Sequence, residues 1–424
     1  MTTIADSKSA LPDAIWLTPP QQPCDTGSNR RSRRGVRPFD LSKTSELLNL
    51  FGELPSEPEL LAALRLNLIS GIGPRTQQAL FKQFGSPQAV WSASIRELQQ
   101  VEGVGPKLSA AIVAARCDDA AEREWARCRD LNIDLIARGS SMYPRPLAEI
   151  HDPPGVLYVQ GGLAPRDELA IAIVGSRHCT LYGRQQAERL AGSLARAGLT
   201  IVSGLARGID AAAHRGALAA GGRTLAVLGT GLANIYPPEH AGLAAEVRAH
   251  GSLISESALD QAPVPGLFPQ RNRIISGISL AVLVIEASRK SGALHTVRHA
   301  LEQGREVFAV PGRVDSLSSE GCHDVLRDGA TLVRNADDVL EGLGPLIGPV
   351  KSGETGVVHS PRELTLDPQE RLILNLIPND PIAVDEVLRT ANLETSRVLA
   401  TLTVLEMKRM VCRLPGNKIC RLQA

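Results

Sequence analysis

The sequence predicts an α/β protein with a doubly wound parallel core, preceded by an all-α domain and followed by a small winged-helix domain. Between residues 170 and 333, short apolar runs alternate at least six times with amphipathic segments, the pattern of parallel strands connected by helices. Upstream, a glycine–hydrophobic–glycine motif occurs twice within helical patterns. Downstream, three helical segments precede a hairpin pattern.

Composition limits both the class of protein and the class of partner. The 424 residues suffice for two to four domains, and 43% of them are apolar, enough for ordinary cores. The net charge is only +1, so any basic site must be local. Aromatic residues make up 3%, which disfavours a base-stacking surface of many rings. The seven cysteines show no metal-ligand spacing, and no apolar run suits a membrane span or a signal peptide. We therefore expect a cytoplasmic protein with reduced thiols and no metal or cofactor.

The first 120 residues divide into a tail and a helical domain. Residues 1–55 are rich in Pro, Ser, Thr and Arg, which is typical of disorder, and their arginine cluster suits a solvated tail better than a phosphate site. In residues 56–120 the glycine motif begins at Gly71 and again at Gly103, each time followed by a proline that opens a helix. Such helix-hairpin-helix units occur in many DNA-binding proteins. Arg75 and Lys107 would contact phosphate, although packing alone explains the hairpins equally well.

The predicted core, residues 121–344, is organised around the run Ile171–Asp210. Two apolar runs flank one amphipathic segment, and each run ends in small residues followed by an arginine. Because ligands of open α/β sheets bind at the carboxyl ends of strands, we expect these two turns to form a double anion site. The residues assigned to it are Gly175, Ser176 and Arg177 after the first strand, and Ser203, Gly204, Arg207 and Gly208 after the second. Asp210 is expected to cap the following helix.

The rest of the core continues the alternation. Segments 131–136 and 156–161 are expected to add strands at an edge of the sheet. We expect further strands at 224–228, 252–255, 280–285, 306–310 and 331–333, and helices at 209–220, 241–249, 293–303 and 322–327. The proline-rich segment 262–269 is expected to be a loop that runs into Arg271, Asn272 and Arg273.

Residues 345–364 are rich in Gly, Ser and Pro and are expected to form a linker. Residues 365–424 follow with helical patterns at 368–377, 383–390 and 394–407 and a hairpin at 411–422, which together predict a winged helix. The third helix would be the recognition helix, but it is apolar. A protein-docking or packing role therefore fits it at least as well as reading of a duplex.

Cofactor and metalloprotease motifs are incomplete. Gly229-Thr230-Gly231 lacks the rest of a dinucleotide fingerprint, and no P-loop motif is present. His295 and His299 lack the glutamate of a zinc-protease helix, so we expect an exposed or half-packed pair. His214 is expected to be a satisfied histidine on a helix face.

Two glutamates and a group of arginines remain. Glu256 and Glu286 end strands and would suit N-glycosidic hydrolysis, but without a nucleophile motif we expect them to orient nearby arginines. The basic residues at the presumed ligand edge are Arg177, Arg207, Arg271 and Arg273, accompanied by Asn272, Ser291 and Gly292. A cationic track with few rings fits the phosphate backbone of single-stranded nucleic acid.

On these residues the chain resembles DNA-processing protein A, the bacterial Smf family. The resemblance is carried by residues 173–177, 203–214, 229–231, 236–237, 254–256, 268–275, 286–287, 291–296 and 309–312, and it extends over about 60–422. The most specific part is the α/β core, in particular Phe268-Pro269-Gln270-Arg271-Asn272-Arg273.

The resemblance implies a SAM-like helical domain, an extended Rossmann-like core and a C-terminal winged helix. It also implies a function without catalysis: binding incoming single-stranded DNA during natural transformation, protecting it and helping to load the RecA recombinase. A homodimer formed through the core is implied as well. Carried onto this sequence, Arg177 and residues 271–273 would line the DNA pocket, with Arg207 beside them.

Two enzyme hypotheses compete with binding. The core is more distantly similar to Rossmann-like phosphoribohydrolases that cleave nucleoside monophosphates. However, Lys290-Ser291-Gly292-Ala293-Leu294-His295-Thr296 lacks their paired glycines and the following glutamate. Duplex repair through the paired hairpins lacks the catalytic residues that glycosylases carry after the hairpin. Both absences favour binding.

Overall fold

The computed structural model describes residues 57–343, 350–352, 356–358, 363 and 366–422. The predicted tail, residues 1–55, lies outside the described residues, as does most of the predicted linker. Within the described ranges, no helix combines the length and the apolar character that crossing a bilayer requires. The six cysteines described carry free thiols.

The N-terminal part is helical, as predicted. Its elements are α2 (Glu57–Leu68), α3 (Pro74–Phe84), α4 (Pro87–Ser92), α5 (Ile95–Leu98), α6 (Pro106–Ala114), η1 (Ala115–Cys117) and α7 (Ala120–Asp130). Both predicted hairpins are present: Gly71 and Gly103 take positive φ angles, and Pro74 and Pro106 open α3 and α6. Proline suits this position because the first amide of a helix has no carbonyl partner.

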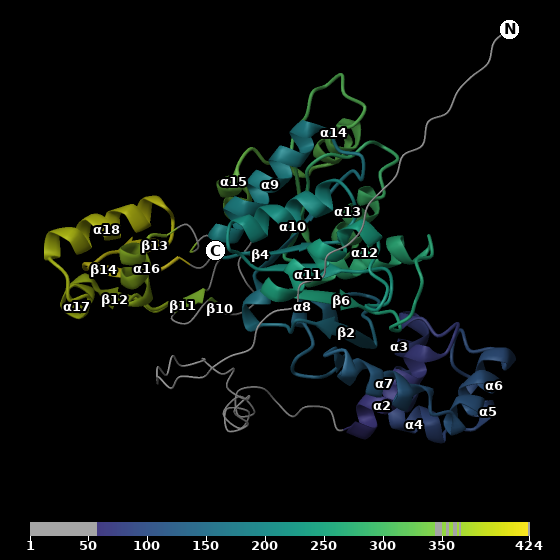
Figure 1. Ribbon diagram of the computed structural model, residues 1–424. Coiled ribbons are helices and arrows are strands. Elements are labelled where there is room, and N and C mark those ends of the chain that lie inside the picture. Colours follow the sequence, from purple (N-terminus) through teal and green to yellow (C-terminus); the bar gives the residue numbers. More distant parts are fainter. Residues whose placement is uncertain (1–56, 344–349, 353–355, 359–362, 364–365, 423–424) are drawn as a thin grey trace, which may run out of the picture. The chain divides into compact units, whose positions relative to one another are not determined.

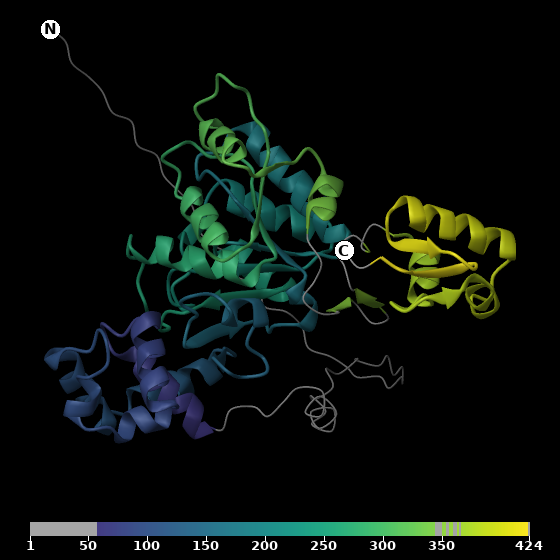
Figure 2. The ribbon, with the colours of Figure 1, turned by 180° about the vertical axis from the view of Figure 1, so that it is seen from behind.

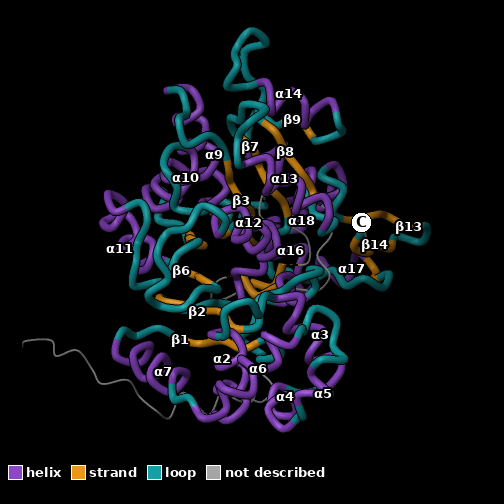
Figure 3. The backbone as a smooth tube through the Cα atoms, turned by 90° about the vertical axis from the view of Figure 1, so that its right-hand side faces the viewer, coloured by secondary structure: helices purple, strands orange, loops and turns teal. Residues whose placement is uncertain are grey.

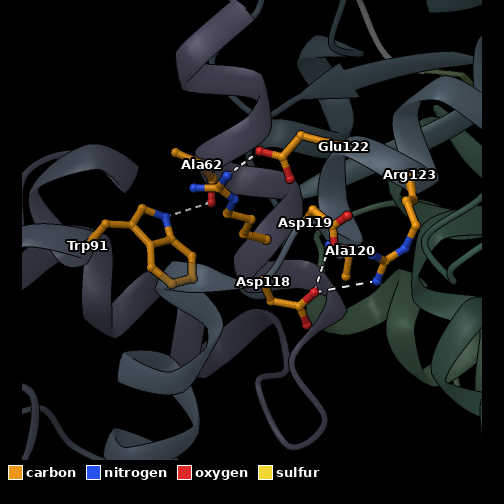
Figure 4. Close-up of polar contacts among 8 residues, drawn as sticks. Ala62, Trp91, Asp118, Asp119, Ala120, Glu122 and Arg123 are labelled. Atoms are coloured by element: carbon orange, nitrogen blue, oxygen red, sulfur yellow. Dashed lines mark hydrogen bonds and ion pairs between the residues drawn. The ribbon is translucent and has the colours of Figure 1, made fainter.

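Polar contacts tie the helices of this part together (Figure 4). The indole Nε1 of Trp91 donates to the Ala62 oxygen at 3.0 Å, and Arg65 pairs with Glu122. The Ala120 amide donates to Asp118 at 2.9 Å, which helps α7 to begin at this residue.

The core is a nine-stranded sheet in the order β1-β2-β6-β5-β4-β3-β7-β8-β9 (Figure 3). The strands are β1 (Asp134–Ala137), β2 (Val156–Gln160), β3 (Ala170–Val174), β4 (Thr200–Ser203), β5 (Thr224–Val227), β6 (Ser252–Ser255), β7 (Ala281–Val284), β8 (Glu306–Ala309) and β9 (Thr331–Leu332). From β6 to β9 all neighbours are parallel, whereas β2 pairs antiparallel with β6 and with β1. The predicted parallel core and its two added edge strands are therefore confirmed.

Helices cover both faces of the sheet (Figures 1 and 2). The connecting elements are α8 (Arg145–Ala148), η2 (Pro165–Glu168), α9 (Leu181–Arg196), α10 (Ile209–Ala219), η3 (Pro238–His240), α11 (Ala241–His250), α12 (Leu267–Ile278), α13 (Ala293–Glu302), α14 (Glu320–Arg327) and α15 (Ala336–Gly342). Alternate side chains of β3 show the two layers: Ile171 and Ile173 pack with α9, α10 and α15, while Ala172 and Val174 pack with α12 and α13. This burial of both faces explains the continuous apolar runs in the sequence.

The segment containing Arg271 differs from its prediction. Instead of a loop at a strand end, Leu267–Ile278 forms α12, and only the residues before it are irregular. Phe268-Pro269 reads as turn chemistry, but Pro269 occupies the third position of the helix. The first helical turn tolerates proline because its N–H groups have no intrahelical carbonyl to donate to.

The C-terminal part has the predicted winged-helix elements. They are α16 (Pro368–Asn375), β12 (Ile382–Ala383), α17 (Val384–Thr390), α18 (Thr395–Met407), β13 (Val411–Leu414) and β14 (Lys418–Arg421). The last two strands form the hairpin, and β12 adds to it in the order β12-β14-β13. Inside the predicted linker, β10 (Val350–Ser352) pairs antiparallel with β11 (Gly356–Val358). The valines at 350, 357 and 358 favour strand geometry.

Candidate nucleic-acid interface

A cleft of about 390 Å³ opens at the carboxyl ends of β3 and β7. Strands β4, β5 and β6 extend the sheet on one side of β3, and β7, β8 and β9 extend it on the other. Ligands of doubly wound sheets bind where the strand order reverses in this way. The lining comes from the turn after β3, the start of α10, helix α12 and the segment that joins β7 to α13.

The turn after β3 supplies three of the predicted residues. The backbone amide of Ser176 donates to the backbone carbonyl of Glu286 at 2.7 Å, and the backbone carbonyl of Ser176 accepts from the Ile209 amide at 3.2 Å. A Cβ at Gly175 would lie 2.6 Å from Ile209, so glycine is required for this close approach. These two hydrogen bonds fix the turn. The exposed side chain of Arg177 projects from it into the cleft, with Cζ 5.5 Å from the ring centroid of Phe268.

The turn after β4 has a different role from the one expected. Ser203 is fully buried and donates through Oγ to the Ile173 oxygen at 2.6 Å. Gly208 has a φ of 75°, and a Cβ there would lie 2.2 Å from the Ser176 oxygen. Neither residue lines the cleft, and both support the first turn. Gly204 and Arg207 lie at a smaller recess beside Arg177, where Arg207 pairs with Glu239 at 2.5 Å.

Arg271 forms the base of the cleft rather than an exposed cation. Its side chain is buried, and Nη1 donates to the oxygens of Gly204, at 2.8 Å, and of Val227. Burial lowers the pKa of Arg271 to about 10, and the Asp210 carboxylate partly offsets this effect. Asp210 does not cap its own helix as predicted, because its Oδ2 accepts from the amides of Gly204 and Ala206 at 3.1 and 3.3 Å. Burial raises the pKa of Asp210, and Arg271 opposes the rise.

Arg273 does not line the cleft, contrary to expectation. It is 2% exposed and pairs with Glu256 and, at 3.5 Å, with Asp152. Two residues beyond Arg271 on a helix, it points to another side because successive residues turn by about 100°. The prediction that Glu256 orients an arginine is confirmed. Burial raises the pKa of Glu256, and Arg273 lowers it in part.

Glu286 holds a helix terminus instead of an arginine, which corrects the other half of that prediction. Its Oε2 accepts from the amide and the hydroxyl of Thr180, both at 3.0 Å. Thr180 in turn accepts from the Gly183 amide at 3.1 Å and thereby caps α9. The carboxylate thus fixes the helix that begins next to the cleft.

The segment after β7 completes the cleft. Ser291 and Gly292 line it, as does Asn272, whose Nδ2 donates to the Gly292 oxygen at 3.4 Å. Lys290 also lines the cleft and was missed, although it directly precedes the predicted Ser291-Gly292. It is exposed and has no ion pair among the described residues. The signal was available: a lysine at the carboxyl end of a strand, next to the same small residues.

The cleft presents an excess of positive charge. Among its lining residues, Arg177, Lys290 and Arg271 are cationic and Asp210 is anionic, which gives three minus one, or +2, with the histidines neutral. Arg271 and Asp210 are both buried and offset each other. The two exposed charges, Arg177 and Lys290, are therefore free to attract an anion.

The other candidate features are structural. Thr230 donates to the Asn234 oxygen at 2.7 Å, and a Cβ at Gly231 would lie 2.1 Å from the oxygens of Ala258 and Leu259. This glycine loop is thus filled by protein, as its incomplete fingerprint suggested. His214 is buried with Nδ1 2.7 Å from the Thr224 hydroxyl, but its Nε2 is buried without a hydrogen-bond partner among the described residues, so the predicted satisfied histidine is only half satisfied.

Two pairs of residues singled out from the sequence remain, His295 with His299 and Arg75 with Lys107. His295 is exposed and His299 half-buried, in agreement with prediction, although His295 also reaches the cleft rim. Arg75 and Lys107 are exposed in the first turns of α3 and α6.

Comparison with known proteins identifies three regions. Residues 134–344 match the family model described as DNA recombination-mediator protein A, residues 359–417 match the DprA winged helix domain, and residues 63–116 match a SAM-like helix-hairpin-helix tandem. The chain is 33% identical over 385 residues to Protein Smf of Synechocystis, covering 83% of this chain and 96% of the relative. It is 40% identical over 290 residues to Protein Smf of Escherichia coli, covering 68% and 77%. The crystal structure of DNA processing protein A from Streptococcus pneumoniae superimposes with a TM-score of 0.59 at 32% identity, over 66% of this chain and 96% of that one.

Proposed function

The chain belongs to the family of DNA recombination-mediator protein A, which includes the Smf proteins, and from this premise we propose that it binds single-stranded DNA in the cleft between β3 and β7. The observation that carries the proposal is the pair of exposed cations, Arg177 and Lys290, above a floor whose own charges cancel. A phosphodiester has one negative charge and strong acceptor oxygens, and guanidinium and ammonium groups are its usual partners.

Phosphate contact accounts for the affinity, and the neighbouring rings suit the bases. Phe268 lies beneath Arg177, and its ring centroid is 5.5 Å from that of Tyr236. Stacking on such rings contributes about 1–3 kcal/mol per base and tolerates any base, since every base has a π face. We therefore propose binding without strong sequence preference. Gly175, Ser176, Asn272, Ser291 and Gly292 would surround the backbone at close range.

The size of the cleft favours one strand over two. A volume of about 390 Å³ is typical of sites that enclose a small ligand, and a short stretch of a single strand fits it. A duplex holds its bases inside and offers the rings no exposed face. We accordingly propose tighter binding to single strands than to duplex.

The wider role that we propose follows the family. The protein would act in the cytoplasm, protect incoming single strands during natural transformation and recombination, help to load the RecA recombinase, and form a homodimer through its core. The cleft supports the protection of single strands, because a protein bound to backbone phosphates shields the strand that it covers.

We propose binding rather than catalysis. The alternative, N-glycosidic hydrolysis of nucleoside monophosphates, needs carboxylates beside the bound nucleotide. Glu256 is engaged by Arg273 and Glu286 by Thr180, and neither carboxylate lines the cleft. Asp210 does reach the lining but is held by two amides and faces Arg271.

Gel-shift titration tests this function. Single-stranded and duplex oligonucleotides of several lengths would be titrated at two salt concentrations. We expect single strands to bind more tightly, with affinity that falls as salt rises. Equal or tighter binding of duplex would overturn the proposal. Incubation with nucleoside monophosphates should yield no free base, and release of base would instead support the hydrolase.

A further inference from the structure

A second basic feature lies where α9 and α10 pack against each other. The helices approach closely because Gly192 and Gly216 stand at their contact: a Cβ at Gly216 would lie 2.3 Å from the Glu188 oxygen, and one at Gly192 would lie 3.1 Å from the Gly216 oxygen. Beside this contact runs a groove of about 580 Å³, lined by residues of both helices. None of its lining residues belongs to the cleft between β3 and β7.

Three exposed arginines line this groove, which we name the arginine groove: Arg189 and Arg196 from α9 and Arg215 from α10. Arg189 and Arg196 are seven residues apart, so they project from the same side of α9 about 10 Å from each other. Glu188 is the only carboxylate among the nine lining residues, which leaves three minus one, or +2.

Internal pairing does not explain these arginines. Arg196 donates to the Ser193 hydroxyl at 3.2 Å, and Arg189 donates to Gln186 and to the Arg334 oxygen, both at 2.7 Å. Within the part of the chain that the structure describes, none of the three forms an ion pair. Guanidinium groups that meet no carboxylate add nothing to stability through charge pairing, yet they create a local positive potential.

We propose that the arginine groove binds the phosphate backbone of a single strand whose other part occupies the cleft. This inference rests on the proposed function. Helix α9 begins at Leu181, close after Arg177 in the chain, and the cap formed by Thr180 and Glu286 fixes its start. Arg189 lies eight residues after Leu181, so a strand that leaves the cleft and follows α9 from its first residue reaches Arg189 after about 12 Å of helical rise. A flexible single strand can follow this path, whereas a duplex is stiff over about 150 base pairs.

The test uses the full chain with Arg196→Ala and Arg215→Ala combined. Arg189 is retained because it holds the Arg334 carbonyl. The matched control is Arg248→Ala on α11, an exposed arginine outside both sites and without an ion pair among the described residues. Binding would be measured over a range of salt concentrations with two oligothymidylates. Single-strand binding modules cover about 4–16 nucleotides, and the short oligothymidylate has a length near the lower of these values. The long oligothymidylate is several times longer than the short one.

For the long oligothymidylate we expect the double variant to lower the log–log salt slope by about 1.4, from about 0.7 for each lost phosphate contact. The short oligothymidylate should bind the double variant and the wild type alike, and Arg248→Ala should change neither. The proposal for the arginine groove would be overturned if the double variant kept the wild-type salt slope with the long strand. It would also be overturned if the double variant lost affinity equally for both strands. If the wild type fails to bind even the short strand, the function proposed for the cleft fails instead.

Discussion

The guanidinium of Arg271 donates to the backbone oxygen of Gly204 at 2.8 Å, so a side chain of helix α12 fixes the turn that follows β4. The same turn donates two amides to Asp210, whose charge acts on Arg271. The second glycine turn is therefore a support for the cleft, built from buried charge, while the turn carrying Arg177 presents the charge that a ligand meets.

Substituting Gly204 with valine should destabilise the fold. A Cβ at this position would lie 2.6 Å from both terminal nitrogens of Arg271, so the buried guanidinium would have to shift away from the Gly204 and Val227 oxygens to which it donates. Overpacking of this kind costs about 1–3 kcal/mol. Urea unfolding would measure the loss. The control is Gly292→Ala, where no atom lies within 4 Å and the fold should be unaffected. Equal stability of Gly204→Val and wild type would refute the packing role.

Arg271→Ala and Arg177→Ala should separate stability from binding. Removing Arg271 leaves Asp210 buried without its opposing charge, which typically costs about 3–5 kcal/mol. Removing the exposed Arg177 should change the free energy of unfolding by no more than about 0.5 kcal/mol and yet weaken single-strand binding. Unfolding curves and gel shifts on both proteins decide the matter. A stable Arg271→Ala protein would show that this pair is dispensable.

His214 should make the fold sensitive to acid. Burial, with added repulsion from His240, Arg271 and Arg215, lowers the pKa of His214 from its ordinary 6.5 to about 3. Between these two pH values the unfolded chain therefore binds more protons than the folded chain. The contribution of His214 to the free energy of unfolding is fully present above pH 6.5 and is lost as the pH drops towards 3. The folding constant should fall by up to tenfold per pH unit from this residue alone.

The measurement is urea unfolding at several pH values from 7.5 down to 5. His214→Gln should be less stable at pH 7.5, because the bond to Thr224 is disturbed, but its stability should depend less on pH. The exposed His295→Gln serves as the control and should retain the wild-type dependence. An unchanged pH dependence in His214→Gln would exclude this histidine as the source.

The alternation of strands and helices was predictable because buried parallel strands and amphipathic helices leave periodic apolar patterns. The position of Gly175, Ser176 and Arg177 followed from the same reasoning, since a turn after a strand must lie at the carboxyl edge. The start of α12 was not predictable from local chemistry. Proline at 269 suggests a break but is equally at home in a first helical turn.

Burial of charge was the main feature that sequence reasoning missed. Arg271 and Arg273 look like ligands in a linear motif, yet the helix turns them to different sides: Arg273 forms an ion pair with Glu256, and the charge of the buried Asp210 acts on Arg271. Such pairing depends on strand order and helix orientation, which one sequence does not specify. Lys290, by contrast, was open to prediction on the grounds that identified Arg177.

The most direct test of the cleft is the salt dependence of binding to a short oligothymidylate. Wild type, Arg177→Ala and Lys290→Ala would be compared, with Arg248→Ala as the control. Each cleft variant should weaken binding and lower the log–log slope by about 0.7, because each removes one phosphate contact. Slopes and affinities equal to those of the wild type in both cleft variants would contradict the account.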